Sequence, residues 1–340
     1  MQLFQTPNFD FIRWRWYAIG LSLLVIVAGL ALVATRGVPL GIDFSGGTIV
    51  IVKFDQPVTA ERVRQAVDSL PGEKVVQQYG TPGEGQWLIR LPQVQTSEQG
   101  TSLEQGSQQI VQSLQKAGLP SFEVISTEIV GPVIGAELQR RGVYATLASI
   151  VAITLYIAFR FRFSFAVGAI AATFHDIFVT LAFLMFFGYE LSLNVVAAIL
   201  TITGYSVNDT IVIFDRVREN LRSMRREPLE QVVNTSVNQT LARTVITAGT
   251  TFLSVLSLYL FGGEVLRGFA FTMLVGIISG TYSTVFIASA IAIILSHRRR
   301  PTTAVSAAAG RPEARPARPE ARPGRPEARP GRKTRGARAS

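Results

Sequence analysis

Six long apolar runs constrain what this 340-residue chain can fold into more than any other feature of its sequence. A helix that crosses a bilayer needs about 20 predominantly apolar residues, and its backbone must satisfy its own hydrogen bonds in lipid. The sequence therefore predicts a polytopic α-helical membrane protein with six transmembrane helices. The predicted spans are Tyr17–Thr35, Val143–Phe159, Phe165–Phe187, Leu191–Phe214, Leu241–Phe261 and Gly268–Leu295.

Basic residues beside the spans predict the orientation of the chain, because lysine and arginine concentrate in cytoplasmic loops. Both termini would be cytoplasmic, and Arg140 and Arg141 violate this scheme. The first run is too long for the apolar region of a cleavable signal peptide, so we interpret it as an uncleaved anchor. The residues that fix the orientation are Arg13, Arg15, Arg160, Arg162, the cluster Arg216–Arg226 and the segment His297–Arg300.

A polar segment, residues 37–137, separates the first span from the second. Its β-branched runs, apolar stripes and Pro/Gly breaks predict the order strand, helix, strand, strand, helix, strand, which is that of a small ferredoxin-like α+β domain. The orientation places this domain on the extracytoplasmic side. It contains no histidine or cysteine, so interaction or substrate handling is expected of it. The predicted elements are Thr48–Phe54, Thr59–Leu70, Lys74–Tyr79, Gln86–Leu91, Ser102–Ala117 and Phe122–Ile129.

The C-terminal tail, residues 297–340, carries the whole excess of positive charge. It has 13 Lys/Arg and 3 Glu, whereas the residues before it balance at 20 basic and 20 acidic. Its density of proline predicts a disordered cationic arm, which anionic lipid or ribosomal RNA would attract. A solvated tail without a specific partner is the alternative. The remaining predicted regions are 1–36, the cytoplasmic N-terminus and first helix, and 138–296, five helices with a cytoplasmic loop at 215–240.

Several classes of chemistry are excluded by residues that the sequence lacks. The chain has no cysteine, which excludes disulfides, zinc–thiolate clusters and thiol catalysis. It also has no GxxxxGK[ST] phosphate loop to support ATP hydrolysis. We therefore predict that the protein is not an enzyme and has neither a cofactor nor a metal site.

Four ionisable residues lie within or at the end of the predicted spans: His175, Asp176, Asp209 and Arg243. A carboxylate in the bilayer core costs about 3 kcal/mol on insertion scales, and such acids usually have a function. Asp209, beside Asn208, is therefore the leading candidate for a membrane-embedded proton or ion site. The alternative is that Asn208 and Asp209 hydrogen-bond to neighbouring helices and only stabilise packing.

Asp209 and Arg243 together would be enough for a proton cycle. Burial raises the pKa of a carboxyl group, whereas a nearby guanidinium lowers it. An aspartate that alternates between an apolar environment and an arginine would therefore take up and release a proton as helices move. A static ion pair, or an Arg243 that extends to the cytoplasmic face, is the alternative. Asp176 is a second candidate, although His175 and Thr173 could satisfy it structurally.

Small residues are frequent in the last predicted span, and small side chains let helix backbones approach closely. We expect this face to pack against another helix of this chain or of a partner subunit. The residues are Gly268, Gly276, Ser279, Gly280, Ser283 and Ser289.

Five long motifs closely resemble those of the SecF family of the bacterial SecD–SecF complex. They occur in the family's order and cover nearly everything before the tail. The family has six spans with a soluble extracytoplasmic domain after the first, in an architecture related to resistance-nodulation-division exporters. By this resemblance, Asp209 and Arg243 correspond to the family's proposed proton-relay acid and arginine. The motifs are GIDFSGGT at Gly41–Thr48, VGPVIGAEL at Val130–Leu138, FHDIFVT at Phe174–Thr180, GYSVNDTIVIFDRVREN at Gly204–Asn220 and NQTLARTVITAGTT at Asn238–Thr251.

The resemblance implies assistance to protein export across the bacterial cytoplasmic membrane. Such a chain would draw on the proton-motive force at late stages of translocation, while SecA supplies ATP energy to the SecYEG translocon. Its partners would be exported preproteins, membrane lipid and SecD, which would supply the other half of the helical bundle and meet the small-residue faces. Two alternatives stay open: a non-conducting scaffold that stabilises SecD and the translocon, and a resistance-nodulation-division-type exporter of lipids or small molecules.

Overall fold

The computed structural model describes residues 8–71, 74–80, 83–91 and 101–297. Within these residues, six helices are long and apolar enough to cross a membrane, as the sequence predicted. The predicted tail lies outside the described residues apart from His297. The six candidate spans are Ile12–Arg36, Val133–Arg160, Phe163–Phe187, Leu193–Ser223, Leu229–Phe261 and Val265–Ser296.

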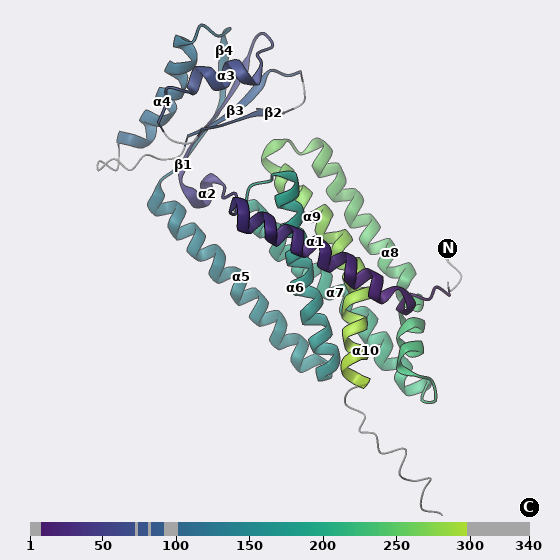
Figure 1. Ribbon diagram of the computed structural model, residues 1–340. Coiled ribbons are helices and arrows are strands. Elements are labelled where there is room, and N and C mark those ends of the chain that lie inside the picture. The colour runs from purple at the N-terminus through teal and green to yellow at the C-terminus, as the bar shows by residue number, and fades with distance from the viewer. Residues whose placement is uncertain (1–7, 72–73, 81–82, 92–100, 298–340) are drawn as a thin grey trace, which may run out of the picture. The chain divides into compact units, whose positions relative to one another are not determined.

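Several membrane helices are longer than the apolar runs that predicted them. The second span begins at Pro132 rather than Val143, and the fourth continues to Ser223 rather than ending at Phe214. An apolar run marks only the part of a helix in lipid, whereas an established helix can add further turns in water at little cost. The helices are α1 (Arg15–Arg36, after a short 3-10 turn, η1, Ile12–Trp14), α5 (Pro132–Arg160), α6 (Phe163–Phe187), α7 (Leu193–Ser223), α8 (Leu229–Phe261), α9 (Glu264–Ser283) and α10 (Ser289–His297) (Figure 1).

The last span is interrupted by one π-helical segment, η2 (Thr284–Ala288), between α9 and α10. The hydroxyl of Ser289 donates to the carbonyl oxygen of Thr284 at 3.0 Å, across the widened turn. Gly168 of α6 lies against this segment, and a Cβ atom there would come within 2.5 Å of the carbonyl oxygen of Ala288. Single π-turns inside α-helices are rare and occur often at functional sites.

The soluble domain is a four-stranded antiparallel sheet in the order β2-β3-β1-β4. Helices α3 and α4 cover one face of this sheet (Figure 1). The β-α-β-β-α-β order and this strand arrangement confirm the predicted ferredoxin-like domain. The short helix α2 (Ile42–Ser45) was not predicted, because four residues show no apolar period. The elements are β1 (Gly47–Phe54), α3 (Ala60–Val67), β2 (Val75–Tyr79), β3 (Gln86–Leu91), α4 (Thr101–Lys116) and β4 (Phe122–Val130).

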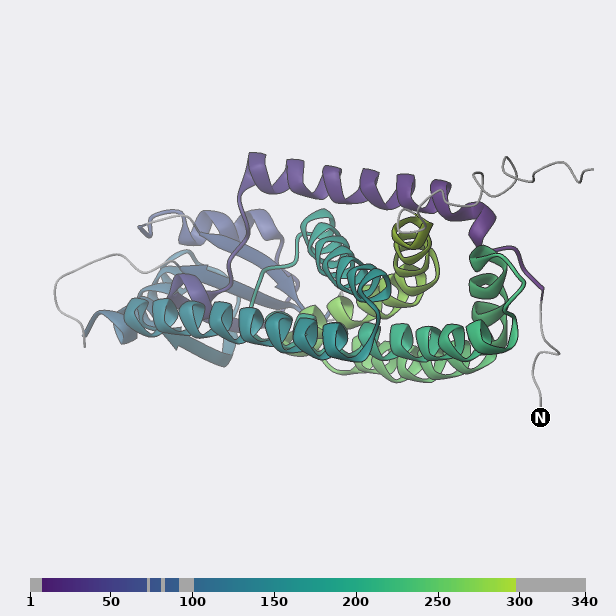
Figure 2. The ribbon, with the colours of Figure 1, turned by 90° about the horizontal axis from the view of Figure 1, so that it is seen from below.

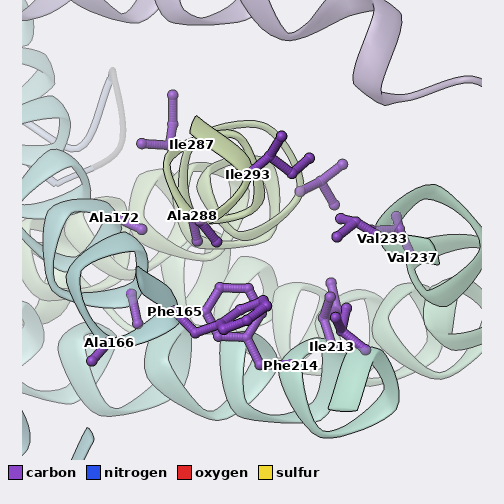
Figure 3. Packing of buried hydrophobic residues seen from close by; sticks show 14 of the residues in the cluster. Phe165, Ala166, Ala172, Ile213, Phe214, Val233, Val237, Ile287, Ala288 and Ile293 are labelled. Carbon is purple, nitrogen blue, oxygen red and sulfur yellow. The ribbon is translucent and has the colours of Figure 1, made fainter. Parts of the chain in front are cut away.

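The membrane helices pack around α6, α7 and the last span. Figure 3 shows Phe165 of α6 against Phe214 of α7, with ring centroids 5.1 Å apart in an edge-to-face arrangement, and Val233 of α8 closing the cluster near Ile293 of α10. Figure 2 shows α1 and α5 on opposite sides of α6. Helices α1, α5 and α8 bury little of their apolar surface within this chain, so most of that surface faces lipid or another subunit.

The small-residue face of the last span packs against helices of the same chain. Gly276 lies against the side chain of Ile202 of α7, and a Cβ atom at Gly280 would come within 2.9 Å of the Cβ atom of Ser206. The expectation that this face meets a SecD subunit is therefore wrong for Gly276 and Gly280. Close approach was correctly predicted, but residue size alone does not determine which helix approaches.

Candidate functional site

Two buried aspartates lie on adjacent helices of the bundle. The Asp176 layer is Asp176 with the side chains bonded to it, and the Asp209 layer is Asp209 with its neighbour Thr210. Asp176 of α6 is 1% exposed and Asp209 of α7 is 4% exposed. Ser206, which bonds to Asp176, precedes Asp209 by three residues, a rise of about 4.5 Å along the helix. Asp209 and the serine of α7 that contacts Asp176 therefore both lie on the buried face of α7. The two carboxyl groups nevertheless have different surroundings.

Asp176 is surrounded by hydrogen-bond donors. The hydroxyls of Ser206 and Ser283 donate to its Oδ2 at 2.5 and 2.8 Å, and the hydroxyl of Ser279 donates to Oδ1 at 2.7 Å. The serines come from α7 and α9, so a single carboxylate links three helices. Hydrogen bonds to a charged group are shorter and stronger than neutral ones, which makes this network a strong helix-to-helix contact.

His175 extends the Asp176 network toward α1. Its Nδ1 lies 3.0 Å from Asp176 Oδ1, and its ring stacks on Tyr282 with centroids 6.1 Å apart. The hydroxyl of Tyr282 donates to the carbonyl oxygen of Ala18 in α1 at 2.6 Å. Thr173, the other predicted neighbour, is not part of the network, because its hydroxyl donates to the carbonyl oxygen of Ala169 in its own helix.

Asp209 is nearly as deeply buried as Asp176 but lacks such a network among the described residues. Its Oδ2 is inaccessible and accepts no hydrogen bond from any residue that the structure describes. The adjacent Thr210 is bonded to Thr284, the first residue of the π-helical segment, with 3.0 Å between the hydroxyl oxygens. An unpaired polar atom in a buried site is costly, so its presence calls for a functional explanation.

The structure places Arg243 and Asn208 differently from the buried acids. Arg243 of α8 is exposed, and within the described part of the chain no carboxylate lies within ion-pair distance of it. Its helix, α8, packs against α7, the helix that carries Asp209. Asn208 is exposed on another side of α7. The two predicted relay residues are thus on adjoining helices but form no ion pair within the described residues, and Asn208 is outside the buried site.

Sequence reasoning missed the three serines around Asp176. Ser279 and Ser283 were interpreted only as small packing residues, although their i, i+4 spacing places both hydroxyls on one helix face. Ser206 lies inside the GYSVNDT motif, one turn before Asp209. No group of three His, Asp or Glu side chains among the described residues is arranged to hold a metal ion.

The N-terminal end of α7 is joined to the soluble domain. Asp43 of α2 accepts a hydrogen bond from the backbone N–H of Leu193, the first residue of α7, at 2.8 Å. Arg90 of β3 forms an ion pair with Glu190 of the α6–α7 loop at 2.9 Å and donates to the carbonyl oxygen of Leu40. A carboxylate at a helix N-terminus is favoured by the helix dipole. The helix that carries Asp209 therefore begins at the attachment of the domain.

Comparison with known proteins matches the chain to one family over most of its length. The family model "Protein export membrane protein SecD/SecF, C-terminal" matches residues 109–298, and the "SecD/SecF GG Motif" model matches residues 31–58. The protein translocase subunit SecF of Escherichia coli O157:H7 is 38% identical over 292 residues, which cover 86% of this chain and 89% of that protein. The SecF of Desulfurispirillum indicum is 42% identical over 283 residues, covering 82% and 89%.

A solved structure shows the same architecture. The crystal structure of SecDF from Thermus thermophilus, a translocon-associated membrane protein, matches with a TM-score of 0.77 and 36% identity over 87% of this chain. The match covers 40% of the SecDF chain, so the chain spans about two-fifths of that longer protein. With a family model that covers more than half of its residues and relatives near 40% identity, this chain belongs to the SecF family of protein export membrane proteins.

Proposed function

We propose that this chain is the SecF-like subunit of a SecD–SecF complex and assists protein export through the Sec translocon by using the proton-motive force. Relatives named as protein translocase subunits and the likeness to translocon-associated SecDF support this proposal. The proposal places both termini in the cytoplasm, with the soluble domain outside the cytoplasmic membrane. SecYEG, SecA and exported preproteins are the further partners it implies.

The unpaired carboxylate oxygen of Asp209 is the observation that carries the proton-driven part of the proposal. If the acid served only packing, its oxygens would be hydrogen-bonded as those of Asp176 are. An acid that must change its protonation state benefits instead from surroundings that do not fix one state. We propose that Asp209 takes up and releases the proton, and that Arg243 stabilises its deprotonated form when the helices approach.

Further buried polar atoms on the helices of the bundle suggest a path for the proton. The hydroxyls of Tyr205 and Thr244 and the Nε2 atom of His175 are buried and have no hydrogen-bond partner among the described residues. Buried polar groups of this kind are usually satisfied by ordered water. They come from α6, α7 and α8, so water at these positions would connect the two aspartate layers, with Asp176 and His175 as accessory members of the relay.

The exposed polar residues of α7 and α8 support a SecD partner. Arg243, Thr250 and Ser254 of α8 and Asn208 of α7 are exposed within segments that the bilayer would otherwise surround. Polar groups in a membrane face the interior of a bundle or another subunit. We propose that SecD covers this surface and completes the environment of Asp209. The SecDF chain supports this proposal, because the match covers 40% of it and the rest has no counterpart in this chain.

Helix α7 would transmit the protonation change to the soluble domain. Asp209 lies in the middle of α7, and the backbone N–H of Leu193 at its N-terminus is held by Asp43. A shift or rotation of α7 would therefore pull on the Asp43 contact and on the Arg90–Glu190 ion pair. We propose that the domain moves through these contacts and that its movement assists the exported chain.

The test compares Asp209→Asn with Asp209→Glu and Asp176→Asn in the complex of this chain with its SecD partner. Proton conductance is measured in proteoliposomes, and export of a secreted reporter is measured in cells. We expect Asp209→Asn to lower conductance about a hundredfold and to slow export, Asp209→Glu to retain more of both, and the assembled complex to be recovered in each case. Normal conductance and export in Asp209→Asn would overturn the relay.

A non-conducting scaffold is the second candidate function, and the Asp176 network favours it. Carboxylate–serine contacts that join three helices are what a purely structural subunit would need. A scaffold predicts that Asp176→Asn disrupts the complex with SecD, whereas Asp209→Asn has no effect on export. The relay predicts an export defect in Asp209→Asn while the complex stays intact.

A further inference from the structure

A strongly basic cavity lies where α5 ends, α6 begins and α7 leaves the membrane. Its volume is about 500 Å³, and four arginines line it: Arg160, Arg162, Arg218 and Arg222. Nothing in the proposed proton relay uses these side chains. They come from two separate stretches of the sequence, which only the fold brings together.

The positive charge of this cavity is largely uncompensated. Arg160 is paired with Asp215, which accepts at 2.6 and 2.8 Å and lies beside the cavity. Arg162, Arg218 and Arg222 have no carboxylate partner within the described part of the chain. Three like charges around one cavity repel each other, and a bound anion would relieve that repulsion.

Two buried phenylalanines, which we call the aromatic floor, also line the cavity. Phe165 and Phe214 are buried, pack edge to face with centroids 5.1 Å apart, and contribute to the lining (Figure 3). The arginines would suit the charged headgroup of a phospholipid, and the aromatic floor would suit the apolar groups next to it. Basic pockets between transmembrane helices are known to bind such headgroups.

We propose that this cavity binds a phosphate-bearing anion, supplied either by the headgroup of an anionic phospholipid or by soluble phosphate. Arginine suits this ligand because its planar guanidinium donates two parallel hydrogen bonds to phosphate oxygens. Arg218 and Arg222 lie one helical turn apart, and Arg162 faces them from the α5–α6 turn. The aromatic floor favours the phospholipid over the soluble anion. The site is independent of the proposed proton relay.

The test uses the full-length chain with Arg218→Gln and Arg222→Gln combined. The matched control combines Arg225→Gln and Arg226→Gln, which removes two charges from the loop after α7 but leaves the cavity lining intact. Each protein is equilibrated with mixed micelles of phosphatidylcholine and phosphatidylglycerol, and retained lipid is counted by native mass spectrometry. Binding of inorganic phosphate is measured separately by ³¹P NMR, and thermal unfolding shows that both variants are folded.

We expect the cavity variant to retain phosphatidylglycerol about tenfold less tightly, since two charge-assisted contacts are lost, and the control to differ little from the unsubstituted chain. Cavity-dependent binding of inorganic phosphate without lipid retention would support the site and assign it to a soluble anion. Equal losses in both variants would overturn the proposal, because attraction to net charge would explain them. Unchanged binding of both probes in the cavity variant would also overturn it.

Discussion

Asp176 and Asp209 lie on neighbouring helices at nearly equal burial, yet their surroundings are opposite. Three serine hydroxyls and a histidine nitrogen contact the first carboxylate. The second has a buried oxygen that no described residue contacts. Both acids cost free energy to place in a membrane, but among the residues that the structure describes hydrogen bonds offset that cost at Asp176 and not at the buried Oδ2 of Asp209. Burial alone therefore does not show which of two acids is satisfied by hydrogen bonds.

The two layers also differ in what they connect. The Asp176 layer ties α6 to α7 and α9 and, through His175 and Tyr282, reaches α1. The Asp209 layer adjoins the π-helical segment through Thr210 and Thr284, and the adjoining helix α8 carries the exposed Arg243. The first arrangement is held by hydrogen bonds from several helices, whereas the second is the one that we propose the SecD partner completes. Four substitutions test this difference.

The largest expected effect is on proton conductance in Asp209→Asn. We expect a fall of about a hundredfold, the lower end of what a positioned proton-transfer group contributes. Thermal unfolding of the variant should not move to lower temperature, because the buried Oδ2 of Asp209 accepts no hydrogen bond from the described residues that the substitution would break. If Asp176→Asn lowers conductance as strongly without affecting stability, the assignment of the two roles is reversed.

The next effect is on stability in Asp176→Ala. Loss of four contacts to one carboxylate should lower the free energy of unfolding by about 2 to 3 kcal/mol, given the modest strength of interhelical hydrogen bonds in membranes. Titration with a denaturing detergent measures it, with Asp209→Ala as the matched variant. Equal stability of the two alanine variants would mean that the serine network contributes nothing.

A third effect concerns the helix contact beside the π-helical segment. In Gly168→Ala the new methyl group would meet the backbone oxygen of Ala288, which cannot move away as a side chain could. We expect a loss of about 2 kcal/mol, as for overpacking in a core. Gly204→Ala is the control, because nothing lies within 4 Å of a Cβ atom there. If both variants unfold at the same temperature, the π-helical segment accommodates the added methyl group without the expected loss of stability.

The smallest effect is expected from removing one serine of the network. Ser279→Ala should lower the free energy of unfolding by about 1 kcal/mol, since Asp176 keeps its other donors. Ser289→Ala is the comparison, because within the described residues that hydroxyl donates to the backbone of its own span at Thr284 and not to Asp176. The same detergent titration applies to both, and a larger loss in Ser289→Ala would show that the π-turn contributes more than the network.

Much of the fold could be predicted because its signals are local. A run of about 20 apolar residues has few stable alternatives to a membrane helix, so all six spans were found. The strands of the soluble domain followed from β-branched runs between breaks, and β3 was placed at its observed bounds, Gln86–Leu91. Helix ends were missed where the helix continues for several polar residues beyond its apolar run, as at Pro132 and Ser223.

By itself, the sequence determined that this is a six-span membrane protein with a ferredoxin-like domain and with Asp176 and Asp209 inside its spans. These features follow from the composition of each segment and the spacing of its apolar residues, which are local properties of the chain. Only the tertiary structure decided which acid is satisfied. Ser206, Ser279 and Ser283 reach Asp176 from two other helices, and no spacing along the chain encodes that contact. Hydrogen-bond satisfaction depends on atoms within about 3 Å, whatever their separation in sequence.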